Sequence, residues 1–466
     1  APSRAHIVPA KFSLLWRTAF STLYLRFSYF TLTKSSRPRH YWDAITYICF
    51  RNGKKCNRGD FLAEVKTRKK KYLHEVDLMR VLFIGGVLLN HTTTAFRNNV
   101  GSGSGSELFL EASHLALHFT RMGFMFMTGL VLVLNYYNKE HHWLKFWKKR
   151  YISVGIPYIG WNAIMMWFTT ITAGIALNWP NYFQNLFDAI IHGNKFYMYY
   201  IIVTFQLYLI FPLLVYMFKK FKNHHLAVLT VSAVLQLLLV IGIKYWLPGV
   251  DRDGWWYLFR AYGLNILVYQ FYFIAGAFVA IHYDQVDRFI EKNHRMIGWS
   301  TLALAIGTVA LFFGNINILK LSLSASLSIH QPLIFIYDTF MIAFVFWIGR
   351  QYAHARNHGF PNWLEKIIKN MSKVSFGIYL VQTIPVTILY GILSVIHLPS
   401  IVTLLLLPFG YAFVLGGSFL ISWFCYKVPP FGILIGRPQH IFSAKKAKGV
   451  VENVKNNESI KQTVKE

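Results

Sequence analysis

The stretch MRVLFIGGVLLNH, residues 79–91, is apolar except near its two ends, where an arginine and a histidine stand. It predicts part of a membrane helix, because the apolar run around it can cross a bilayer core of about 30 Å at about 1.5 Å per residue. Arg80 and His91 are both costly inside a bilayer. The stretch therefore predicts a membrane helix that carries two ionisable side chains for a structural or functional reason.

The composition of the whole chain extends this prediction. The 466 residues are 55% hydrophobic and 14% charged, with a mean hydropathy of +0.37, whereas a soluble domain of this length needs more polar surface. The formal charge is +29, and the basic residues form short clusters between apolar runs, which is typical of membrane-protein loops. Because the sequence has no zinc-finger spacing and no basic stripe interleaved with stacking aromatics, we expect no nucleic-acid partner. The three cysteines predict no disulfide framework.

The apolar segments define a topology. We expect about ten membrane helices, over residues 78–96, 108–137, 151–175, 196–217, 226–247, 263–282, 296–314, 332–349, 373–396 and 400–426. The loops that follow the even-numbered segments carry Lys and Arg clusters, and those that follow the odd-numbered segments are poor in net positive charge. By the positive-inside rule this alternation predicts an all-α, polytopic helix bundle with both termini cytoplasmic. We expect its location to be the plasma membrane.

Two terminal segments differ from this body. Residues 1–72 hold 16 Lys and Arg against three acidic residues and show no clear helical period. They are either an amphipathic surface anchor or a segment with no folded role, and the missing period favours the second reading. Residues 73–436 form the predicted membrane domain. Residues 437–466 are polar and predicted to be a disordered cytoplasmic tail.

The spacing of Arg80 and His91 places them on one face of their helix. Eleven residues at 100° per residue are about 20° past three full turns, and the two side chains are about 16 Å apart along the axis. Arg80 alone can be a boundary residue whose head reaches the interface, and His91 alone can bond a neighbouring helix. Together they can also form the two ends of one polar pocket, with an anion held at the inner mouth and chemistry done deeper in.

A second set of ionisable residues follows on the next apolar segment. Glu107, Glu111, His114, His118 and Arg121 recur at steps of four, three, four and three residues, which is one face of a helix. Such a stripe does not face lipid. It either lines an internal cavity or forms a structural hydrogen-bond network between helices.

Several stretches in order resemble the acyltransferase-3 family of integral membrane acyltransferases. They are Arg-x10-His preceded by HEVD with Asp77, RMGFMFMTGLVL (121–132), FWKKRYISVGIPYIGW (146–161), FYMYYIIVTFQLYLIFPLL (196–214), FYFIAGAFV (271–279) and VSFGIYLVQ (374–382). The resemblance covers about residues 75–436 and is nearest to the stand-alone enzymes that acylate surface polysaccharides, such as poly-N-acetylglucosamine succinyltransferases. It departs at Ser153, where the family often has a second arginine, and at Gln382, where histidine is common.

The resemblance implies an activity and roles for residues. Family members transfer an acyl group, usually from cytoplasmic acyl-CoA, to a sugar hydroxyl outside the cytoplasm. A hydroxyl needs a general base, and a neutral histidine suits that role. We therefore expect His91 and Arg80 to be the catalytic residues, with His91 as the base and Arg80 holding phosphates of the donor at the inner interface. A covalent acyl-histidine intermediate is the alternative role of His91. Arg150 and Lys149 are the expected donor-binding residues, although positive-inside anchoring also explains them. Glu111, His114, His118 and Arg121 are the expected pocket-lining residues.

The partners follow from the same resemblance. We expect acyl-CoA as a co-substrate, no permanently bound cofactor and no metal, with the lipid bilayer and a surface polysaccharide or its precursor as partners. The acyl group is acetyl or succinyl. Two other hypotheses stay open: a polysaccharide exporter or flippase, which also needs an internal polar stripe, and a structural partner of a glycan synthase, for which the Arg80/His91 pair has no use.

Overall fold

The computed structural model describes residues 72–139 and 142–437, so the predictions for residues 1–71 and 438–466 lie outside the described residues. Every regular element in the described part of the chain is helical, which confirms the all-α prediction. The elements are α4 (His74–Arg97), α5 (Gly105–Leu117), α6 (Phe119–Tyr136), α7 (Trp143–Thr172), α8 (Trp179–His192), α9 (Tyr199–Lys220), α10 (His225–Ile241), η1 (Gly242–Trp246), η2 (Leu247–Gly249), α11 (Tyr257–Arg260), η3 (Tyr262–Leu264), η4 (Ile266–Tyr269), α12 (Gln270–Ile281), α13 (Tyr283–Asn317), α14 (Leu323–Ser326), α15 (Pro332–Ala355), η5 (Arg356–His358), α16 (Asn362–Val381), α17 (Thr383–Val395), α18 (Ser400–Leu405), α19 (Leu407–Lys427) and η6 (Phe431–Ile435).

All ten predicted apolar segments fall on single helices or on runs of two or three consecutive helices. Within the described residues, six helices are long and apolar enough to cross a membrane, and the pair α16–α17, bent by 59°, makes a seventh. Helices α4 and α7 have 24 and 30 residues, which suffices for a crossing, but they are less apolar. The chain is therefore a polytopic membrane helix bundle, while the count of ten spans stays a prediction.

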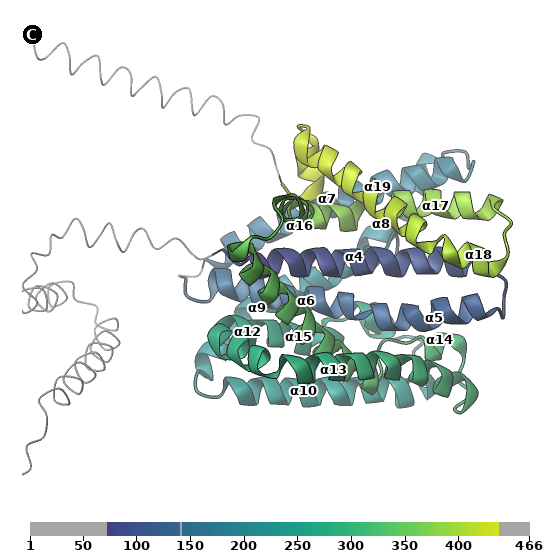
Figure 1. The fold of residues 1–466 in the computed structure, drawn as a ribbon. Coiled ribbons are helices and arrows are strands. Elements are labelled where there is room, and N and C mark those ends of the chain that lie inside the picture. Colours follow the sequence, from purple (N-terminus) through teal and green to yellow (C-terminus); the bar gives the residue numbers. More distant parts are fainter. Residues whose placement is uncertain (1–71, 140–141, 438–466) are drawn as a thin grey trace, which may run out of the picture. The chain divides into compact units, whose positions relative to one another are not determined.

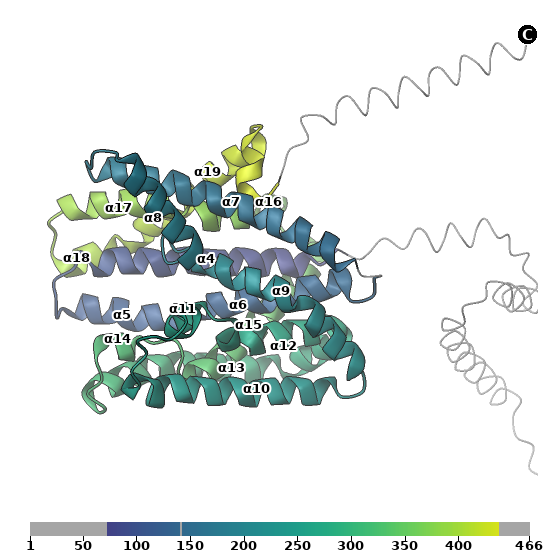
Figure 2. The same cartoon turned by 180° about the vertical axis from the view of Figure 1, so that it is seen from behind.

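Helix α4 is the central element of the bundle. Both views show it between α5 and α6 on one side and the group of α7, α8 and α17 on the other (Figures 1 and 2). It packs against α5, α6, α15, α16, α17 and α19. Its buried side chains include Met79, Phe83, Ile84 and Leu88, all 0% exposed. The apolar stretch of the sequence is thus the protein core rather than a lipid-facing surface.

Two neighbouring glycines let other helices approach α4 closely. A Cβ added to Gly86 would lie 2.5 Å from Thr120 Cγ2 of α6, and one added to Gly85 would lie 3.0 Å from the Tyr411 hydroxyl of α19. That hydroxyl donates a hydrogen bond of 3.1 Å to the carbonyl oxygen of Gly85. In lipid no hydrophobic effect drives helices together, so their association depends on close van der Waals packing. Small residues at such positions allow that packing.

The first turn of α4 is fixed by polar contacts at the basic-loop end of the bundle. Arg350 of α15 forms two bonds of 2.6 Å with the carboxylate of Asp287 on α13 and lies 3.4 Å from Glu75 Oε1. The Tyr283 hydroxyl also donates to Glu75. Because Glu75 is 2% exposed, these partners compensate a charge that is costly to bury alone.

The closest approach of two helices joins α6 to α12. A Cβ on Gly276 would lie 1.9 Å from the carbonyl oxygen of Phe126, and one on Gly129 would lie 2.1 Å from that of Phe273. Both stretches belong to the sequence patterns that carry the family resemblance. The glycines therefore hold α6, and the cavity residues on it, in place.

We predict that Gly276→Ala lowers the free energy of unfolding by about 2 kcal/mol or more, because its methyl group overlaps a backbone carbonyl that cannot move alone. Gly314→Ala is the matched control, since no atom lies within 4 Å of a Cβ at that position. Thermal unfolding of the detergent-purified variants measures both. Equal Tm values for the two variants would contradict the close contact of α6 with α12.

Candidate functional site

A cavity of about 340 Å³ lies within the bundle beside α4. Its walls come from α4, α6, α7, α9 and α16 and from the segment around η6. It extends from the exposed Arg437 to the half-buried His91. The cavity therefore connects the basic-loop end of the bundle with the interior of the membrane domain.

The charge of this cavity is one-sided. Its lining residues include five Lys and Arg side chains and no Asp or Glu: Arg80, Arg121, Arg150, Lys373 and Arg437. A cavity whose lining carries several cationic side chains and no acidic one favours a ligand that brings negative charge. The cavity is thus suited to bind a polyanion.

The structure brings together four of the residues that the sequence singled out. Arg80 and His91 line this cavity, as their helical spacing predicted, and so do Arg121 and Arg150. Lys149 is exposed and does not line it. Lys149 and its neighbour Arg150 point in different directions, because consecutive residues of a helix are about 100° apart around its axis.

Arg150 is held by aromatic rings. Its guanidinium lies 5.5 Å from the ring centre of Tyr136, 5.9 Å from that of Phe146 and 5.8 Å from that of Tyr208. Its buried Nε atom has no hydrogen-bond partner among the described residues. Rings attract the cation without neutralising it, so its positive charge remains available to a ligand.

The imidazole of His91 packs on a tyrosine that the sequence reasoning missed. The two ring centres of His91 and Tyr197 are 3.9 Å apart, at an interplanar angle of 33°. No described residue forms a hydrogen bond with the imidazole. Its nitrogens are therefore accessible to a substrate in the cavity.

The backbone that carries Tyr197 is unusual. Phe196 and Tyr197 have φ angles of 55° and 61°, a region that costs non-glycine residues energy. Their carbonyl oxygens accept hydrogen bonds from Thr383 (3.2 Å) and Tyr379 (2.5 Å), respectively. These bonds hold the turn that places Tyr197 against His91. A run of aromatics, KFYMYY, is the only signal in the sequence, and it does not distinguish this tyrosine.

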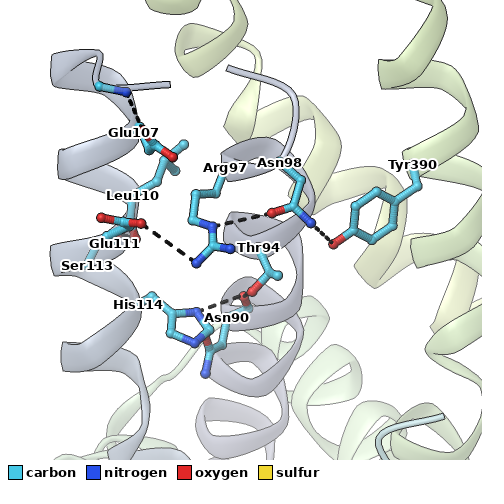
Figure 3. A network of polar contacts seen from close by, with 11 residues as sticks. Asn90, Thr94, Arg97, Asn98, Glu107, Leu110, Glu111, Ser113, His114 and Tyr390 are labelled. Atoms are coloured by element: carbon cyan, nitrogen blue, oxygen red, sulfur yellow. Dashed lines mark hydrogen bonds and ion pairs between the residues drawn. The ribbon is translucent and has the colours of Figure 1, made fainter. Parts of the chain in front are cut away.

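Three residues of the predicted stripe contact α4 instead of the cavity. The contacts are His118 Nδ1 with Asn90 Nδ2 (3.3 Å), His114 Nδ1 with Thr94 Oγ1 (3.3 Å) and Glu111 Oε1 with Arg97 Nη1 (3.8 Å). Figure 3 shows the last two, with Arg97 also bonded to Asn98. Glu107 instead accepts a hydrogen bond from the backbone of Gly103. The stripe thus forms a polar ladder between α5 and α4.

His118 is also the point at which the predicted single helix is interrupted. Helix α5 ends at Leu117 and α6 begins at Phe119, and the backbone N–H of Arg121 bonds the carbonyl of His118 three residues earlier, at 3.1 Å. Beyond this tightened turn Arg121 faces the cavity.

In residues 72–139 and 142–437, no group of three or more His, Cys, Asp or Glu is arranged to hold a metal ion.

We predict that a water-soluble maleimide labels Val87→Cys and leaves Leu88→Cys unlabelled, in a chain whose three native cysteines are replaced by serine. Val87 lines the cavity, whereas its neighbour Leu88 is 0% exposed. Mass spectrometry of the intact protein measures the labelling. Labelling of both residues, or of neither, would contradict a water-accessible cavity on this face of α4.

One comparison with known proteins identifies the family of the chain. A family model described as an acyltransferase domain matches residues 73–426, which is more than half of the chain and contains α4 and nearly all of α19. No curated protein and no solved structure matches the chain. The chain belongs to the acyltransferase-3 family and is an enzyme that transfers acyl groups other than aminoacyl groups.

Proposed function

We propose that this enzyme transfers an acetyl or succinyl group from cytoplasmic acyl-CoA to hydroxyls of an extracytoplasmic polysaccharide, with His91 as the general base. The observation that carries the proposal is the cavity itself, in which five basic residues and no acidic residue share the walls with His91. We propose the plasma membrane as its location, residues 73–436 as the acyltransferase domain and both termini as cytoplasmic.

The mouth of the cavity suits the donor. Arg80, Arg150 and Lys373 each stand at the end of a basic stretch next to a membrane segment, and such stretches are typically cytoplasmic. Coenzyme A carries several phosphate groups, which Arg binds through its planar guanidinium and Lys as a point charge. We assign the phosphates to this end, so that the pantetheine arm extends about 16 Å along α4 to His91.

His91 suits the chemistry. Its imidazole accepts the proton of the acceptor hydroxyl as the oxygen attacks the thioester carbonyl carbon, and a new C–O bond forms. The C–S bond then breaks, the ester leaves with the acceptor, and the imidazolium returns the proton to the thiolate of coenzyme A. Tyr197, packed on the ring, keeps the imidazole oriented through these steps.

We predict that His91→Ala removes the acyl esters from the surface polysaccharide and leaves the polymer itself in place, because general-base catalysis contributes roughly 100- to 10,000-fold. Chemical analysis of the glycan esters in cells measures this effect, with protein level as a check. His224→Ala, at an exposed position in the loop before α10, is the matched control. Loss of the polymer would favour an exporter, and normal acylation by His91→Ala would contradict the assigned base.

We predict that Arg80→Gln raises the KM for acyl-CoA by roughly tenfold while kcat changes less, because one charge-assisted contact with a phosphate is lost. Steady-state kinetics on purified protein separate the two constants, and Tm reports on folding. Arg288→Gln, at an exposed position on α13, is the control for net charge. An unchanged KM in Arg80→Gln with an unchanged Tm would argue against donor binding at this residue.

A further inference from the structure

Arg121 is a half-buried cation that lines the inner part of the cavity. Its Nη1 atom lies 3.3 Å from the Tyr269 hydroxyl, and its guanidinium carbon lies 4.3 Å from the ring centre of Tyr199. Its buried Nε atom has no hydrogen-bond partner among the described residues. Two tyrosines therefore hold the group in place without neutralising it.

Some other arginines of the bundle have carboxylate partners. Arg350 contacts Asp287 and Glu75, and Arg97 lies 3.8 Å from Glu111. Around Arg121, by contrast, no Asp or Glu of the described segments comes within ion-pairing distance. The buried Asp338 interacts with Arg121 electrostatically but bonds the Tyr272 hydroxyl instead. Because a charge without an ion-pair partner is costly in a bilayer interior, a bound substrate is the natural partner for the guanidinium of Arg121.

The depth of Arg121 in the bundle indicates which negative charge of the donor it contacts. It lies 16 residues, or about 24 Å along a helix, from the basic loop that follows α6, whereas Arg150 lies only seven residues, or about 10 Å, after the start of α7 at Trp143. The phosphates of the donor are assigned to the loop end and the thioester to His91. His91 lies at a similar depth, 17 residues or about 26 Å from the start of α4. A negative charge that the bound donor brings to Arg121 therefore belongs to its acyl end and not to its phosphates.

We infer that Arg121 binds the free carboxylate of a dicarboxylic acyl group, so that the donor is a succinyl-type thioester rather than acetyl-CoA. The inference rests on the proposed function, since it takes acyl-CoA as the donor. A guanidinium matches a carboxylate with two parallel hydrogen bonds. The Nε atom of Arg121, which lacks a partner, supplies one of these donors.

The test compares the binding of succinyl-CoA, acetyl-CoA and free CoA to the purified full chain, which needs no acceptor. We expect the wild type to bind succinyl-CoA roughly 10- to 100-fold more tightly than acetyl-CoA, as for a hydrogen-bonded charge. We expect Arg121→Gln to lose this ratio. Arg288→Gln, which removes an exposed positive charge on α13, should keep it.

The binding measurements distinguish a failure of the inference about Arg121 from a failure of the proposed donor. Equal affinity of the wild type for the two thioesters overturns the inference even if Arg121→Gln fails to fold, and so does a ratio that survives in a folded Arg121→Gln. A loss of affinity for both thioesters alike in Arg121→Gln also overturns it, since Arg121 then serves the shared part of the donor. Failure of the wild type to bind all three compounds contradicts the proposed donor instead.

Discussion

Positive charge without acidic partners inside a membrane bundle is the constraint on which the rest of this structure depends. The arginines of the bundle lie in two kinds of environment. Arg350 is neutralised by Asp287 and Glu75 at 2.6 and 3.4 Å, and this contact fixes the first turn of α4. Arg121 and Arg150 are instead surrounded by aromatic rings, which attract a cation but leave its charge uncompensated. The first kind of site stabilises the fold, and the second is ready for an anionic ligand.

The same helix serves both purposes. Helix α4 is packed on several sides, and Gly85 and Gly86 let α19 and α6 approach it closely. Its remaining face carries Arg80 and His91 into the cavity. Since the helix is fixed by its neighbours, the distance between these two side chains is fixed as well. A rigid spacing of this kind suits a donor whose charged and reactive ends are far apart.

Much of this arrangement could be predicted from the sequence, because it depends on local periodicity. The helical class followed from apolar segments and basic loops, and the shared face of Arg80 and His91 followed from eleven residues at 100° each. Both are confirmed. The family resemblance rested on short motifs in order, and the match over residues 73–426 confirms it.

Other features depend on tertiary contacts that periodicity does not encode. An uninterrupted helix would place Glu111, His114 and Arg121 on one face. Because the helix is broken at His118, Glu111 and His114 contact α4, whereas Arg121 lines the cavity. Likewise, the helix predicted over 373–396 is bent by 59° between α16 and α17, at the fully buried Gln382.

Other contributors to the cavity come from distant parts of the chain. Lys373 and Arg437 line the cavity although they lie far from α4 in the sequence. In the sequence alone, each has the character of an ordinary charged residue of a loop or tail. Tyr197 reaches His91 only through a backbone turn with positive φ angles, a conformation that its residue type does not predict.

The central claim is that one cavity holds the donor with its phosphates at the basic mouth and its thioester at His91. A structure of the purified protein with a non-hydrolysable acyl-CoA analogue tests it most directly. The account predicts density for the phosphates beside Arg80 and Arg150 and for the carbonyl mimic within hydrogen-bond reach, about 3 Å, of the His91 imidazole. An analogue bound outside the cavity, or inside it with its reactive end away from His91, would contradict the account.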